Sequence, residues 1–167
     1  ICDKEITSSQ EGDISTKNLV FTYKYLNALD KAEPDSTRVV TEDITQLEKS
    51  LTVSFSREGS CSKKGVAPNQ VGYYELEKER VILSTMTSMD MMSSFQEVCV
   101  MSNTFVISNL DFTPSEDFKI YYRNEKGVLV DLKACFYKSA MYGDGDVFKV
   151  PSENKVCSCD TGKITCQ

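Results

Sequence analysis

The residues with the clearest chemical potential in this sequence are its cysteines. A 167-residue chain carries seven of them: Cys2, Cys61, Cys99, Cys135, Cys157, Cys159 and Cys166. This density is typical of proteins that fold in an oxidising compartment, where thiols pair as disulfides. The competing use is zinc, for which the last three cysteines offer thiolates. A second closely spaced cysteine pair is missing and the chain has no histidine, so we expect disulfides and no metal site.

The odd number of cysteines leaves one thiol without an internal partner. That thiol is free, or it is joined to another chain or to a small thiol. Cys157 and Cys159 are separated by one residue, and such pairs rarely bridge each other because the geometry is strained. We therefore expect one short loop to close within the tail, to Cys166, while the third tail cysteine pairs with the body or stays free.

Catalytic residues are not predicted. Without histidine, neither a Ser–His–Asp nor a Cys–His arrangement can form, and the commonest general base at neutral pH is missing. The tripeptide Asp160-Thr161-Gly162 matches that of aspartic proteases, but it lies between cysteines in a polar tail. A catalytic carboxylate needs a buried, shaped site, so we interpret this tripeptide as a turn. We expect a protein that is not an enzyme.

Two other groups of residues could bind a ligand. Asp144 and Asp146 alternate with glycines, but calcium requires about six to eight oxygen ligands, and we interpret this segment as a turn. A methionine cluster could adapt to a partner or fill a gap in the core, and we favour the core. Its members are Met86, Met89, Met91 and Met92. We expect no cofactor.

Alternation of apolar and polar residues dominates the chain and predicts strands. Turn signals rich in Gly, Pro, Asn and Asp separate the alternating runs. About eight or nine short strands at this spacing favour an antiparallel β-sandwich of macroglobulin or immunoglobulin-like type. The expected strands cover residues 19–25, 51–56, 71–76, 80–86, 98–108, 118–122, 128–132, 134–138 and 147–150.

One segment has the period of a helix. Val40, Ile44, Leu47 and Leu51 fall at i, i+4, i+7 and i+11, which predicts one short amphipathic helix near 41–50 with Thr41 as its N-cap. The exposed face of this helix would be acidic and is our candidate partner surface. It would carry Glu42, Asp43, Gln46 and Glu48.

The chain divides into a sandwich domain over 1–150 and a cysteine-rich tail over 151–167. No apolar run approaches the length of about 18 residues that spans a bilayer. The first residue is Ile1, and the simplest account is a secreted mature chain whose leader, or larger precursor, has been removed, with a trimmed cytosolic chain as the alternative. A net charge of −6 without a basic stripe disfavours nucleic acid and anionic membranes. We expect an extracellular protein partner, basic if it docks on the acidic face.

Several short segments follow one another in an order that resembles a known module. They are 35–47, 80–83, 99–108, 119–122, Cys135 with Phe136 and Tyr137, and the closing Cys157-Ser158-Cys159 with Cys166. This order is similar to the terminal macroglobulin-like, receptor-binding domain and anchor segment of the thioester family of complement components and alpha-macroglobulins. The chain departs from that family in having no thioester Cys-Gly-Glu-Gln sequence and only Lys49 as a lysine in the expected helix.

The resemblance implies a disulfide between Cys2 and Cys135, with Cys61–Cys99 as the second bridge of the body. The residues alone leave two other pairings open, Cys2–Cys61 with Cys99–Cys135 and Cys2–Cys99 with Cys61–Cys135. The function that follows is a secreted, non-enzymatic protein-binding module, immune-related through the resemblance. A lipocalin-like carrier of a small apolar ligand and a secreted structural or storage protein are the alternatives.

Overall fold

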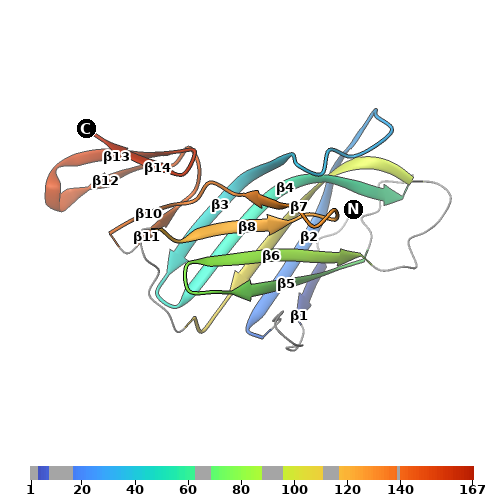
Figure 1. The fold of residues 1–167 in the computed structure, drawn as a ribbon, viewed down its shortest axis with the longest axis horizontal. Coiled ribbons are helices and arrows are strands. Elements are labelled where there is room, and N and C mark those ends of the chain that lie inside the picture. The colour runs from blue at the N-terminus through green and yellow to red at the C-terminus, as the bar shows by residue number, and fades with distance from the viewer. Residues whose placement is uncertain (1–3, 8–16, 63–68, 88–95, 111–116, 139) are drawn as a thin grey trace.

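The computed structural model describes residues 4–7, 17–62, 69–87, 96–110, 117–138 and 140–167 (Figure 1). These residues form fourteen strands and one short 3-10 helix, and no α-helix occurs among them. The strands are β1 (Lys4–Thr7), β2 (Leu19–Leu29), β3 (Val39–Leu47), β4 (Ser50–Ser62), β5 (Gln70–Leu76), β6 (Arg80–Thr87), β7 (Gln96–Ile107), β8 (Lys119–Arg123), β9 (Leu129–Asp131), β10 (Cys135–Tyr137), β11 (Ala140–Tyr142), β12 (Val147–Val150), β13 (Lys155–Asp160) and β14 (Lys163–Cys166), with the helix η2 at Pro151–Glu153.

The predicted antiparallel sandwich is confirmed. One sheet has the order β1-β2-β7-β4-β3 and is antiparallel throughout. The second sheet, β5-β6-β8-β9, lies across it (Figure 1) and is antiparallel except for the parallel pair β6–β8. That parallel pair arises because the chain crosses to the first sheet as β7 and then returns as β8. The alternation in the sequence therefore predicted both the class and most of the strands.

Aromatic rings from both sheets fill the space between them. Phe21, Phe55 and Phe105 come from the first sheet and Tyr122 from the second, and none is more than 1% exposed. The Phe55 ring centroid lies 5.9 Å from that of Phe105 and 4.9 Å from that of Tyr122. Burial of such large apolar surfaces is the main force that holds two sheets together.

The helix expected over 41–50 is wrong, because residues 41–47 belong to the edge strand β3 and residues 48–49 form the turn that leads into β4. A β-bulge inserts Glu42 between Thr41, which pairs with Phe55, and Asp43, which pairs with Ser54. The apolar residues that suggested a helix do not share one face, because Ile44 is buried whereas Val40 is 52% and Leu47 73% exposed, and Leu51 belongs to the next strand, β4. The β-branched residues of the segment also favour a strand.

The described cysteines form three disulfides. Cys61–Cys99 links the neighbouring strands β4 and β7, which is the pairing that we expected for the second body bridge. Cys157–Cys166 closes the expected short loop within the tail. Cys157 and Cys166 lie directly opposite each other in the strand register, whereas Cys99 lies opposite Gly59 and Cys61 opposite Glu97.

The expected Cys2–Cys135 disulfide is wrong, because Cys135 is bonded to Cys159. Strand β13 brings Cys159 back beside β10, where the two Cα atoms lie 5.8 Å apart, a normal separation for a disulfide. Cys159, the third cysteine of the tail, thus pairs with the body of the protein, which is one of the two outcomes that we expected for it. Cys2 lies outside the described residues.

The C-terminal strands form a small sheet of their own, β12-β13-β14, at one end of the sandwich (Figure 1). This sheet begins at Val147, ahead of the tail boundary expected at Val150, and the Cys135–Cys159 bond joins it to β10. Among the described segments there is no helix with the length and apolar character that crossing a bilayer requires.

A glycine on β5 allows the closest approach of the two sheets. A Cβ atom added at Gly72 would lie 2.5 Å from Cγ of Phe21, whose ring is fully buried. We expect Gly72→Ala to destabilise the fold by about 1–3 kcal/mol, because a packed ring cannot move away freely. Urea denaturation measures this change, with Gly143→Ala as a control, because the Cβ added there would meet no atom closer than 3.5 Å, an ordinary van der Waals distance. A Gly72→Ala protein as stable as the wild type would contradict the packing described here.

Candidate functional site: a pocket above the buried Arg57

A charged side chain occupies an inward position of strand β4, which lies between β7 and the edge strand β3. Leu51, Val53 and Phe55 point into the core at alternate positions, and Arg57 continues the same phase. Its side chain is only 4% exposed. The guanidinium therefore lies between the two sheets, at the point where the aromatic core ends.

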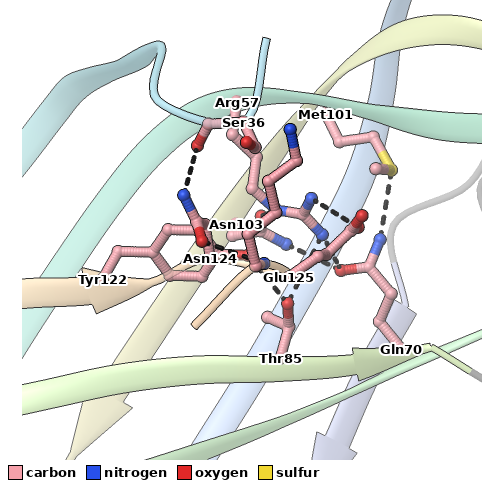
Figure 2. Close-up of polar contacts among 10 residues, drawn as sticks. Ser36, Arg57, Gln70, Thr85, Met101, Asn103, Tyr122, Asn124 and Glu125 are labelled. Atoms are coloured by element: carbon pink, nitrogen blue, oxygen red, sulfur yellow. Dashed lines mark hydrogen bonds and ion pairs between the residues drawn. The ribbon is translucent and has the colours of Figure 1, made fainter. Parts of the chain in front are cut away.

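Acceptors from both sheets bind two of the three nitrogens of this guanidinium (Figure 2). Its Nε donates to Oδ1 of Asn103 at 2.7 Å, and its Nη2 donates to Oε1 of Gln70 at 2.9 Å and to Oγ1 of Thr85 at 3.5 Å. The guanidinium carbon lies 5.6 Å from the centre of the Tyr122 ring, within cation–π range. Burying a charge is costly unless such partners are present, so these contacts explain how the strand can hold an inward arginine.

The third nitrogen of the group faces a carboxylate near solvent. Nη1 of Arg57 lies 3.6 Å from Oε1 of Glu125, whose side chain is 51% exposed. Among the described residues, Glu125 is the one carboxylate within 4.0 Å of this guanidinium. The positive charge is buried, whereas its counter-ion is half in water.

A pocket opens where strand β8 ends. The parallel pairing of β6 and β8 stops at Ser84 and Arg123, while β6 continues to Thr87. The notch that this leaves has a volume of about 360 Å³, within the range of about 300–1,000 Å³ that is usual for ligand pockets. Its walls are formed by Tyr73, Ser84, Thr85, Met86, Arg123, Asn124 and Glu125. Two of these residues, Thr85 and Glu125, contact Arg57 directly, so the guanidinium lies behind the floor of the pocket.

The turn that carries Glu125 is held by the side chain of Asn124. Its Oδ1 accepts hydrogen bonds from the backbone N–H groups of Lys126 and Val128, both at 3.0 Å. Its Nδ2 donates to the carbonyl oxygen of Ser36 at 3.2 Å (Figure 2). The backbone of the turn is thus fixed to the connection between β2 and β3.

That connection is itself held by a nearly buried carboxylate. Oε1 of Glu58 accepts a hydrogen bond from the backbone N–H of Asp35 at 3.0 Å and pairs with Nζ of Lys31 at 2.6 Å. The hydrogen bond from Asp35 and the contact with Lys31 lower the pKa of Glu58 below its ordinary value of 4.5. Glu58 therefore fixes the connection between β2 and β3. This connection in turn holds the turn that carries Glu125, through the hydrogen bond between Ser36 and Asn124.

The predicted partner surface is not a single face. Glu42 lies at the bulge, where its Oε1 accepts a hydrogen bond from Oγ of Ser102 at 2.6 Å. Asp43 is exposed opposite Ser54, whereas Gln46 pairs with Leu51 and points to the opposite side of the sheet. Glu48 is exposed in the turn between β3 and β4. A strand alternates its side chains between two faces, which separates the residues that a helix would have gathered.

The other candidates of the sequence serve turns. Oδ1 of Asp144 and Oδ2 of Asp146 accept backbone hydrogen bonds at 2.7 Å from Thr161 and Gly143. Asp160 is exposed at the end of β13. The described residues contain no group of three or more His, Cys, Asp or Glu side chains placed to hold a metal ion. Of the methionine cluster, Met86 is 62% exposed at the pocket, and Met89, Met91 and Met92 lie outside the described residues.

Sequence reasoning missed Arg57 and Glu125. The sequence did contain a signal for Arg57. It follows Leu51, Val53 and Phe55 at alternate positions, and a charged residue on that inward face must either mark the end of the strand or be buried with polar partners. Glu125 gave no such signal, since a glutamate in a turn is ordinary. Comparison with protein-family models, curated proteins and solved structures finds no match.

We expect Arg57→Met to destabilise the protein by about 2 kcal/mol, because Oδ1 of the fully buried Asn103 would lose its donor. Urea denaturation measures the loss. The control is Arg123→Met, which removes a partly exposed pair with Glu75 and should cost about 1 kcal/mol or less. Equal losses in the two variants would contradict a special role for the buried guanidinium.

Acid should weaken the Glu58 contacts. Because the pKa of Glu58 is lower in the folded protein than its ordinary 4.5, its contribution to stability is present above that value and is lost as the pH falls through the folded-state pKa. We expect the free energy of unfolding of the wild type to fall more steeply than that of Glu58→Gln on acidification below about pH 5. Parallel denaturation curves across a pH series test this, and identical slopes for the two proteins would refute it.

Proposed function

We propose that this protein is an extracellular, non-enzymatic binding module and that it holds its protein partner at the Arg57 pocket. The observation that carries the proposal is the mismatch at Arg57. A guanidinium that is 4% exposed has a carboxylate partner that is 51% exposed, at the mouth of an open pocket. A group from a partner that displaces the exposed Glu125 side chain would meet a desolvated charge, where electrostatic contacts are stronger than in water.

The composition of the pocket supports binding. Tyr73 and Met86 supply apolar surface, while Ser84, Thr85 and Asn124 supply hydrogen-bonding groups. This mixture of apolar walls and a few polar groups is characteristic of ligand sites. The three disulfides support an extracellular location, and the absence of histidine from the sequence favours binding over catalysis.

The alternatives fit the structure less well. A lipocalin-like carrier holds its ligand inside a barrel, whereas here two sheets enclose a core filled by buried aromatic rings. A structural or storage role gives no reason for a buried charge beside an open pocket. An immune role follows only from the resemblance to the thioester family, and the Cys2–Cys135 bond that this resemblance implied is replaced by Cys135–Cys159.

The sequence also led us to predict a basic partner for the acidic residues of segment 41–50, and this stays a prediction. Glu42, Asp43 and Glu48 remain exposed along and beside the edge strand β3. A protein that docks there should be basic, and its binding should weaken as salt is added.

Photo-crosslinking tests the proposed function. Benzoylphenylalanine is placed at Met86, which is exposed at the pocket, and in a second protein at Leu76, which is exposed at the other end of β5. After irradiation in the extracellular fluid from which the protein comes, we expect a discrete adduct from position 86 alone. An absence of adducts at position 86, or equal adducts at both positions, would count against a partner in the pocket.

A further inference from the structure

We propose that the group received at Arg57 is the terminal carboxylate of an extended peptide, and that it replaces the side chain of Glu125. This inference rests on the proposed function and names the chemistry of the partner. In this view Glu125 is an internal stand-in for the ligand. Its carboxylate marks where a ligand carboxylate would lie.

The guanidinium is only partly engaged by its protein partners. Nε and Nη2 make hydrogen bonds within the protein, whereas the Nη1 contact with Glu125 spans 3.6 Å, which is longer than a hydrogen bond (Figure 2). An arginine and a carboxylate prefer a closer approach, with N to O distances of about 2.7–2.9 Å. The preferred ligand of the remaining nitrogen is therefore a carboxylate that can come nearer than Glu125 does.

Glu125 is able to leave. Its side chain is 51% exposed, and the backbone of its turn is held by Asn124 and not by the contact with Arg57. Rotation of one side chain into water would open the guanidinium without moving the turn. Because ion pairs with an exposed partner contribute little, this displacement is cheap.

A strand edge that is unpaired among the described residues lies beside the pocket and favours a peptide over a small acid. Residues Thr85 to Thr87 of β6 pair with β5, and within the described residues no strand pairs with their other side. An extended peptide can add its backbone to such an edge, as in other cases of strand addition. Tyr73 and Met86 would then contact an apolar side chain close to the peptide carboxylate.

Nuclear magnetic resonance titration tests the proposal on the intact protein. The probes are N-acetyl-Ala-Leu-Val with a free carboxylate, the same tripeptide as its carboxyl-terminal amide, and octanoate. The signals followed are the Nε–H of Arg57 and the backbone amides of Thr85 to Thr87. The proteins are the wild type, Glu125→Gln, and Glu79→Gln as a control at an exposed carboxylate in the turn before β6.

We expect the free tripeptide to shift both sets of signals and its amide to shift neither. Glu125→Gln should bind the free tripeptide about threefold to fivefold more tightly than the wild type, because the internal competitor is gone. Glu79→Gln should bind like the wild type. Equal binding of acid and amide, or binding to Glu125→Gln no tighter than to the wild type, would overturn the proposal. If octanoate shifts these signals and the free tripeptide does not, the carboxylate that binds is not that of a peptide.

These outcomes separate the inference from the function on which it rests. A crosslinked partner at position 86 together with a failed titration would leave the pocket as a binding site and remove the carboxylate as its ligand. A failed crosslink with a successful titration would support the carboxylate chemistry and would show that the fluid tested contains no protein partner for the pocket.

Discussion

The need to satisfy one buried guanidinium constrains the structure more than any other single interaction. Arg57 belongs to the first sheet, and its acceptors are divided between Asn103 in the same sheet and Gln70 and Thr85 in the second. Apolar packing tolerates small shifts of one sheet over the other, but hydrogen bonds to a desolvated charge do not. We infer that this network sets how the two sheets lie against each other.

The network also divides the interior into two parts. On one side lies the large aromatic cluster that includes Phe55, and on the other lies a small cluster of Cys61, Cys99 and Met101. Gly59 stands between them, where an added Cβ would lie 2.4 Å from Cε of Met101 and 3.0 Å from Nη1 of Arg57. The small cluster has too few apolar residues to hold the strand ends alone, and the Cys61–Cys99 bond supplies the missing constraint.

Much of the fold could be predicted from the sequence, because alternation reports directly which face of a strand is buried. The segment around β3 failed for a local reason, since the extra residue Glu42 in the bulge breaks that alternation. The pairing of Cys135 failed for a long-range reason. It depends on how the C-terminal sheet folds back onto β10, and the spacing of cysteines carries no information about that arrangement.

The candidate site was harder to predict because five separate segments build it. They contribute Arg57 on β4, Gln70 on β5, Thr85 on β6, Asn103 on β7 and Glu125 after β8, which are distant in the sequence and whose types suggest no shared chemistry. The inward phase of Arg57 was the only advance signal. The pocket itself exists because β8 ends before β6 does, a difference in strand length that becomes meaningful only once the register is known.

The presence of a buried charge at this position supports the proposal that the site has more than a structural role. Where buried ion pairs have been replaced by apolar residues of similar size, proteins are often as stable or more stable. An apolar side chain at position 57, with apolar neighbours in place of Asn103 and Gln70, would extend the aromatic core up to the Cys61–Cys99 bond. The arrangement found here instead keeps a desolvated cation, orders three acceptors around it and leaves its counter-ion half in water. A fold that needed only stability has no use for that last feature, whereas a site that exchanges one carboxylate for another requires it.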